Sequence, residues 1–213
     1  MKFEQTFKNQ TWNFKDTMFS EDEAKILYNA VKNLKAKTIL ELGTGFGTST
    51  IALAAAAQEV GGHVYTCDKS SKSEFTNCDY VKQKIEDLKL AKFCTFYIMD
   101  DLNLAEQWTK PIDLLFIDTS HEYIHTKQEL EKFMPFLTES GECYMHDVLH
   151  SAWCEIENLA ILKFLTNYEK VKKLQNRDSE DMSSIFKSCG KIFSYEIIFT
   201  HCGLGKLYYR KAL

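Results

Sequence analysis

Two groups of acidic and histidine residues each follow an apolar run in the chain. Asp118 and His121 come after the run at residues 112–117, and His146 and Asp147 come after the run at residues 142–145. If the runs are neighbouring parallel strands, their carboxyl ends share one edge of a sheet and these side chains converge there. Histidine exchanges a proton near neutral pH and carboxylates bind divalent cations, so the grouping indicates proton-transfer or metal chemistry.

A glycine-rich loop closer to the amino end has the features of a nucleoside-binding turn. Gly43, Gly45 and Gly47 lie between a strand expected at residues 38–42 and an Ala-rich helix. Glycine permits positive φ angles and lets the backbone approach a ligand closely. Asp68 ends the next expected strand, where an acid accepts hydrogen bonds from ribose hydroxyls.

The glycine spacing and a neighbouring acid distinguish between two cofactor classes. Dinucleotide-binding loops follow the pattern G-x-G-x-x-G, which leaves room for a pyrophosphate. Here the pattern is G-x-G-x-G, and Glu41 stands two residues before the first glycine. A carboxylate at that place suits a cationic amino-acid group and suits a pyrophosphate badly. The loop therefore predicts S-adenosylmethionine rather than a nicotinamide dinucleotide.

With these motifs the sequence resembles the class I S-adenosylmethionine-dependent methyltransferases over nearly its whole length. The resemblance implies that the glycine loop borders the methionine part of the cofactor and that the acid of the second strand binds the ribose. The acid after the third strand would meet the adenine end; two aspartates compete for that place, and the spacing favours Asp100. The cofactor-binding residues implied are Glu41, Gly43, Thr44, Gly45, Gly47, Asp68, Asp100, Asp101 and Asp118.

The later motifs, I-D-x-x-H-x-Y and H-D, resemble the branch that contains metal-dependent catechol- and sugar-type O-methyltransferases. This resemblance implies that Asp118 and Asp147 are metal ligands. It also implies that the catalytic residues are His121, as the general base, and Asp118. His146 stands where some relatives carry a carboxylate, and is the third candidate ligand. Nitrogen suits Mg²⁺ less well than oxygen, which leaves manganese or another transition metal open. His125 is expected at the surface.

The reaction expected from these features is O-methylation of a small hydroxylated acceptor, such as a sugar, a catechol or a specialised metabolite. A net charge of -4 and the lack of an Asn/Asp-Pro-Pro loop argue against a nucleic-acid substrate. Three alternatives stay open: an aminopropyltransferase-like enzyme, a nicotinamide-dependent enzyme, and a non-catalytic S-adenosylmethionine-binding partner protein.

Positioning these residues requires a doubly wound, mostly parallel α/β sheet, since strands and helices alternate along the chain. A short helix is expected around Trp108, and the terminal pair of strands forms an antiparallel hairpin at the sheet edge. The seven expected strands are residues 38–42, 63–68, 94–99, 112–117, 142–145, 195–200 and 204–209. The first of the longer expected helices starts at the Ser20–Glu23 capping box. The others cover residues 48–58, 80–88, 124–136 and 152–165.

The domain plan is an N-terminal arm or lid at residues 1–19 followed by a single methyltransferase domain at residues 20–213. The seven cysteines include no C-x-x-C pair, which favours reduced structural thiols and a cytoplasmic protein. No leader and no membrane segment is expected. A homodimer is the default assembly.

Overall fold

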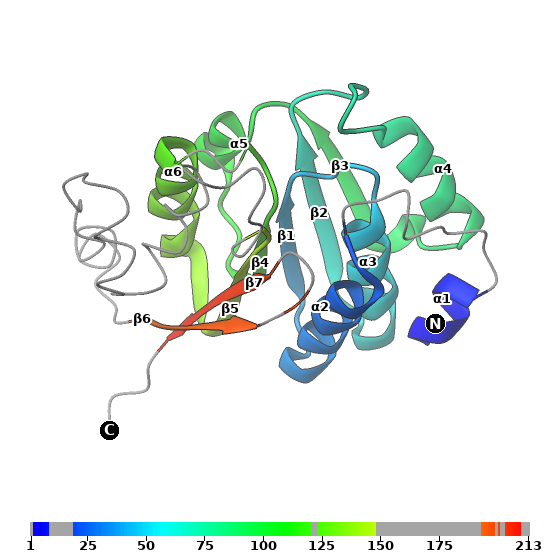
Figure 1. Cartoon of the computed structure of the whole chain (residues 1–213), viewed down its shortest axis with the longest axis horizontal. Helices are drawn as coiled ribbons and strands as arrows, with labels where there is room; N and C mark the ends of the chain where they lie inside the picture. Colours follow the sequence, from blue (N-terminus) through cyan, green and yellow to red (C-terminus); the bar gives the residue numbers. More distant parts are fainter. Residues whose placement is uncertain are drawn as a thin grey trace.

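The computed structural model describes residues 2–8, 19–120, 123–147, 193–198, 200 and 203–209. Its centre is a seven-stranded sheet with the order β3-β2-β1-β4-β5-β7-β6 (Figure 1). Strands β1 to β5 pair in parallel, and β7 runs antiparallel to both β5 and β6. The predicted α/β fold with a C-terminal antiparallel pair is confirmed. The strands are β1 (Thr38–Leu42), β2 (His63–Asp68), β3 (Cys94–Ile98), β4 (Ile112–Ile117), β5 (Leu137–Met145), β6 (Phe193–Ile198) and β7 (Leu204–Tyr209).

Helices cover both faces of the sheet, and each face has its own apolar core (Figure 1). Successive residues of a strand point to opposite faces. The helices are α1 (Phe3–Lys8), α2 (Glu21–Leu34), α3 (Thr48–Val60), α4 (Cys78–Asp87), α5 (Asp101–Gln107) and α6 (Tyr123–Phe133), with 3-10 turns at Ala91–Phe93 and Met134–Phe136. Because of the alternation along the strands, Ile39 and Phe116 lie in the core under α2, α3 and α4, whereas Leu40 and Leu115 lie in the core under α5 and α6.

Several element boundaries differ from the expectation by one to three residues; β6, for example, is Phe193–Ile198 where residues 195–200 were expected. Two further differences have a physical reason. The short helix expected around Trp108 is α5, which ends one residue before it; the Trp108 side chain is buried and its indole N–H donates to the Lys110 carbonyl at 2.8 Å. Strand β5 begins at Leu137, not at residue 142, so Gly141 lies inside the strand. A Cβ on Gly141 would approach the Leu137 Cγ to 2.9 Å, and the register with β4 shifts nearby. Glycine often indicates a loop in a sequence, but Gly141 lies at an irregularity within the sheet.

Helices α2 and α3 form the layer beside β1. The predicted capping box begins α2: the Ser20 hydroxyl accepts from the Glu23 amide at 3.2 Å, and the Glu23 carboxylate accepts from the Ser20 amide at 2.8 Å. Helix α3 starts after Gly47, and its alanines are completely buried. Small side chains let α3 lie close to the sheet and to α2, so the glycine loop that precedes α3 is held on a rigid support.

The amino-terminal residues that are described pack on the domain. The rings of Phe3 and Phe7 lie 4.8 Å apart, and Phe3 meets Tyr28 of α2 edge-on at 5.4 Å. Both phenylalanines are buried, which fits the docking of an arm. The rest of the arm, the helix expected at residues 152–165 and the hairpin turn at residues 201–202 lie outside the described residues.

Four cysteines of the described part, Cys67, Cys78, Cys94 and Cys143, are buried free thiols. This agrees with the expectation of structural thiols for the three that lie in strands. Among the residues that the structure describes, no helix has the length and apolar character needed to cross a membrane.

Candidate active site

The carboxyl ends of the central strands form one rim, as the sequence predicted. Backbone hydrogen bonds continue the strand ladder one residue beyond the strands: the amide of Gly43 donates to Cys67, that of Asp118 to Leu42, and that of His146 to Ile117, at 2.8, 2.8 and 3.0 Å. The first residue after each of β1, β4 and β5 is therefore fixed in position by its neighbouring strand. The glycine loop and both acid–histidine groups start at these residues.

Close packing explains two of the three glycines in the loop. Gly43 has a φ of 95°, and a Cβ there would lie 2.0 Å from the carbonyl oxygen of Asp118. Gly47 has a φ of 86°, and a Cβ there would lie 2.5 Å from a methyl group of Val81. Gly45 has space for a Cβ but also a positive φ of 53°. The first glycine thus brings the loop after β1 into direct contact with the segment that begins at Asp118.

Glu41 lies completely buried under this loop. Its Oε2 accepts from the Thr50 hydroxyl at 2.6 Å, while its Oε1 has no hydrogen-bond partner among the described residues. Burial raises the pKa of the carboxyl from 4.5 to about 7. A buried carboxylate oxygen without a partner costs folding free energy. Such an atom fits a site that receives a cationic group when a ligand is bound.

The acids after β2 and β3 have different environments. Asp68 accepts from the amide of Gly45 at 3.2 Å, so it borders the glycine loop. Asp100 caps the short helix α5 and accepts from the amides of Leu102 and Asn103. Asp101 is buried and engaged with residues of α6. Of the two neighbouring aspartates, Asp100 is therefore the better candidate for the adenine end.

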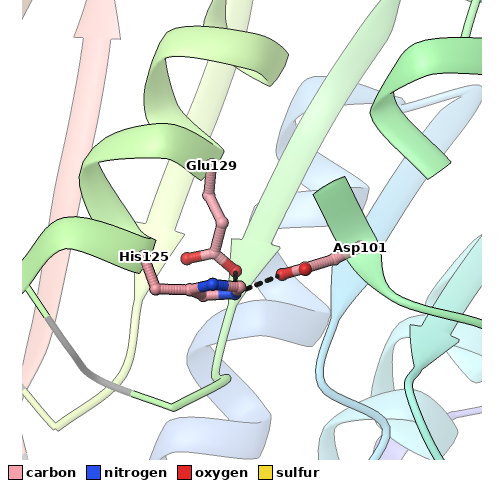
Figure 2. Close-up of side chains that lie close together, drawn as sticks. All are labelled: Asp101, His125 and Glu129. Atoms are coloured by element: carbon pink, nitrogen blue, oxygen red, sulfur yellow. Dashed lines mark hydrogen bonds and ion pairs between the residues drawn. The ribbon is translucent and has the colours of Figure 1, made fainter. Parts of the chain in front are cut away.

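The partners of Asp101 form a compact group, which Figure 2 shows. The Nε2 atom of His125 lies 2.9 Å from the Asp101 carboxylate and 3.6 Å from that of Glu129, and the Thr119 hydroxyl donates to Glu129 at 2.8 Å. Burial alone would raise the pKa of Asp101, but its contact with His125 holds it at about 2. Burial and the nearby Asp101 raise the pKa of Glu129 well above its usual value. The group ties α5, α6 and the loop after β4 together.

His125 was expected at the surface, and the structure places it only partly there. Its side chain is 23% exposed, because the helical spacing of four residues places it beside the completely buried Glu129. The sequence shows that spacing, but only the packing of α5 against α6 brings Asp101 to the imidazole.

His146 is the centre of another cluster, which joins the ends of β4 and β5 to the first turn of α2. Its Nδ1 lies 3.3 Å from an oxygen of Asp118 and 3.4 Å from one of Asp147, and its Nε2 lies 3.4 Å from an oxygen of Glu23. The ring is buried and lies against that of Phe19, with 4.8 Å between the ring centres. Burial opposes the charged form, yet the three carboxylates raise the pKa of His146 well above 6.5.

This group fits a divalent cation. Asp118, His146 and Asp147 each offer a ligand atom, and these atoms lie within 4.8 Å of one another. Both ring nitrogens of His146 are buried, and although carboxylate oxygens lie 3.3–3.4 Å from them, neither makes a well-aligned hydrogen bond among the described residues. Asp147 also has a left-handed backbone, with a φ of 58°, a strained conformation that turns the end of β5. One imidazole and two carboxylates form a donor set typical of Mn²⁺, Fe²⁺, Co²⁺ or Zn²⁺.

Nothing in the sequence indicated that Glu23 belongs to this site, and the structure does not describe one residue that the sequence predicted there, His121. Glu23 was recognised only as a capping-box residue, a role that gives no sign of contact with the end of β5. The predicted general base His121 lies outside the described residues, so its placement stays a prediction.

A family comparison shows which proteins this architecture belongs to. Residues 40–148, just over half of the chain, match a family model described as a methyltransferase domain. The chain belongs to this methyltransferase family. The match begins in β1 and ends just after Asp147, so it covers the glycine loop and both acid–histidine groups of the methyltransferase.

Solved structures share the fold of this methyltransferase at low sequence identity. An O-methyltransferase from Bacillus cereus, in complex with S-adenosylhomocysteine, is 20% identical with a TM-score of 0.65, covering 98% of this chain and 90% of its own. TomG from Streptomyces achromogenes, in complex with S-adenosylmethionine and involved in tomaymycin synthesis, is 16% identical with a TM-score of 0.63, covering 98% and 88%. A candidate caffeoyl-CoA O-methyltransferase from Staphylococcus aureus is 19% identical with a TM-score of 0.65, covering 91% and 85%. The class I methyltransferase fold expected from the sequence is confirmed.

Proposed function

We propose that this methyltransferase transfers the methyl group of S-adenosylmethionine to a hydroxyl oxygen of a small molecule, with a divalent cation held by Asp118, His146 and Asp147. The observation that carries the proposal is the convergence of these three side chains at the rim where Gly43 contacts the Asp118 backbone. A cofactor loop and a cation site in direct contact are what a cation-assisted methyl transfer requires.

The rim offers a partner for each part of the methyl donor, whose sulfonium supplies an activated methyl group. Glu41 and the loop at residues 43–47 suit the methionine end, because the buried carboxylate has an oxygen available for an ammonium group. Asp68 suits the ribose and Asp100 the adenine end. The complexes of the similar Bacillus cereus and Streptomyces achromogenes proteins with S-adenosylhomocysteine and S-adenosylmethionine support this cofactor.

The cation, when bound, would lower the pKa of an acceptor hydroxyl and orient it toward the methyl group. The contribution of the chain itself is positional: Asp118 and His146 are fixed by backbone hydrogen bonds to the neighbouring strands. His121, three residues after Asp118, is the proposed general base that takes the hydroxyl proton. After the transfer, the oxygen carries the methyl group and S-adenosylhomocysteine leaves.

The acceptor proposed is a sugar, a catechol or another specialised metabolite. The net charge of -4 argues against a nucleic-acid substrate, whose binding usually needs a cluster of basic residues. TomG is described as involved in tomaymycin synthesis, and the Staphylococcus aureus protein as a candidate caffeoyl-CoA O-methyltransferase; both descriptions agree with a small aromatic or hydroxylated acceptor.

A combined binding and activity experiment tests this function. Calorimetry with S-adenosylhomocysteine and NAD should show binding of the former alone. Methyl transfer to a panel of sugars and catechols should then require a divalent cation and stop in EDTA. Asp118→Asn and Asp147→Asn should remove the cation-dependent turnover, whereas Asp79→Asn, at an exposed position of α4, should leave it unchanged. Full activity in EDTA would exclude the cation from the reaction.

A further inference from the structure

Glu23 is buried more deeply than its place in the chain requires. A capping-box glutamate needs only to reach the backbone of the residue that caps the helix, which is usually possible at the surface. Here the side chain has no exposed surface, although it lies in the first turn of α2. A buried carboxylate is costly unless other groups compensate its charge. The surroundings of Glu23 therefore indicate a second role.

Each oxygen of Glu23 contacts a different part of the chain. Oε1 accepts from the Thr200 hydroxyl at 2.6 Å, beside the C-terminal pair of strands. Oε2 accepts from the amide and the hydroxyl of Ser20, both at 2.8 Å, and lies 3.4 Å from the Nε2 of His146. These hydrogen bonds hold the carboxylate in place beside the imidazole.

We propose that Glu23 is a positioning residue that fixes the orientation of His146 and makes its Nδ1 a ligand of the divalent cation. This inference rests on the proposed function, because it concerns the same cation site. The two nitrogens of the ring face different carboxylates: Nε2 faces Glu23, and Nδ1 faces Asp118 and Asp147. A proton on Nε2, directed at Glu23, leaves the Nδ1 lone pair for a cation between the two aspartates.

The arrangement has the physical logic of many metal-binding histidines. The ring nitrogen that does not bind the metal usually donates to a carboxylate, which fixes the tautomer and the ring orientation. The packing of Phe19 against the His146 ring adds a steric restraint to the same orientation. Because Glu23 selects a nitrogen ligand, it also favours a transition metal over Mg²⁺, which prefers oxygen ligands.

One competing arrangement uses the same distances. His146 could carry a proton on both nitrogens and act as a cation that neutralises the three surrounding carboxylates. In that case the imidazolium, rather than a metal ion, neutralises Asp118 and Asp147, and Glu23 only balances the positive charge of the ring. The two arrangements predict opposite results when Co²⁺ or Mn²⁺ is added, because only the first gives a metal–nitrogen bond.

The decisive variant is Glu23→Gln, since glutamine also serves in capping boxes and preserves the side-chain volume. The matched control is Glu21→Gln, an exposed position in the same helical turn. Calorimetry of the full chain should show that Glu23→Gln binds Co²⁺ about 10–100-fold more weakly than the wild type. The control should bind Co²⁺ with unchanged affinity, and both variants should bind S-adenosylhomocysteine as the wild type does.

Pulsed electron paramagnetic resonance of the Mn²⁺-loaded wild type gives a second readout. A nitrogen coupling from His146 is expected, and it should be lost in His146→Ala and reduced in Glu23→Gln. Thr200→Val tests the same role without altering the carboxylate: the loss of its hydrogen bond to Glu23 should weaken Co²⁺ binding in the same direction. If Glu23→Gln fails to fold, Thr200→Val and the nitrogen coupling still decide the inference.

The possible failures are distinguishable. Unchanged Co²⁺ affinity in both Glu23→Gln and Thr200→Val, with Asp147→Asn abolishing binding, would overturn the role of Glu23 and leave the proposed function intact. Metal binding without a nitrogen coupling would also overturn it, because His146 would not be a ligand. A wild type that binds S-adenosylhomocysteine but neither Co²⁺ nor Mn²⁺ would exclude the cation site and the inference together.

Discussion

Replacement of Glu41 by glutamine should have opposite effects on stability and on cofactor binding. Glu41 is completely buried, and burial raises the pKa of its carboxyl from 4.5 to about 7. Below pH 4.5 the group is neutral in both the folded and the unfolded chain, so it imposes no cost. Above pH 7 it is charged in both, and the folded chain bears the whole cost of the buried anion. Stability should therefore fall as the pH rises through this window.

The magnitude follows from the two pKa values. A tenfold change in an equilibrium constant corresponds to about 1.4 kcal/mol, so the buried anion lowers the free energy of unfolding by about 3 kcal/mol between pH 4.5 and 8. Glutamine keeps the acceptor for the Thr50 hydroxyl but has no charge. Urea unfolding of Glu41→Gln without cofactor should lack this part of the pH dependence and give a more stable protein at pH 8.

Cofactor affinity should change in the other direction. A hydrogen bond to a charged group contributes about 1.5–3 kcal/mol, so Glu41→Gln should bind S-adenosylhomocysteine about 10–100-fold more weakly at pH 8. Glu86→Gln, at an exposed position of α4, controls for the change in net charge. If Glu41→Gln shows the pH dependence of the wild type, Glu41 does not titrate as argued. If its affinity for S-adenosylhomocysteine is unchanged, Glu41 is not the partner of the ammonium group.

Four further substitutions, with Gly45→Ala as a control, test the packing around the site and the binding of the cofactor. Gly43→Ala should lower the free energy of unfolding by about 2–6 kcal/mol, from backbone strain and from overlap with the Asp118 carbonyl, whereas Gly45→Ala, with ordinary contact distances, should cost less than half as much; equal losses in urea unfolding would contradict this. His125→Ala leaves Asp101 without its imidazole partner and should cost about 2 kcal/mol in the same assay; a neutral effect would exclude a stabilising ion pair. Asp68→Asn should weaken binding of S-adenosylhomocysteine about 10-fold by calorimetry, through weaker hydrogen bonds to the ribose; unchanged affinity would place the ribose elsewhere.

The fold could be predicted in detail because local patterns determine most of its elements. The capping box at Ser20 and the strand at His63–Asp68 appear in the structure as expected. The errors arose where a local signal had a tertiary cause. Gly141 resembles a loop residue in the sequence, but it lies within β5, where the irregular pairing with β4 needs a residue without a side chain.

The site was only partly predictable for a similar reason. Parallel strands place their carboxyl ends together by topology, so the convergence of Asp118 with His146 and Asp147 could be inferred from the motifs alone. The contact between Glu23 and His146 joins residues more than a hundred positions apart on elements that do not pair as strands. No spacing rule connects them. The same holds for Asp101 and His125, which meet only because α5 packs beside α6.

Direct contacts connect the loop that would hold the cofactor with the residues that would hold the cation. Gly43 lies against the backbone of Asp118, so the loop that would hold the methyl donor and the first cation ligand have little freedom to move apart. On the other side, Asp118 faces His146, which Glu23 holds against the first turn of α2. Misplacement of reacting groups by 1 Å can cost about 100-fold in rate. The rim therefore fixes the distance between the proposed methyl-donor site and the proposed cation site before any ligand binds.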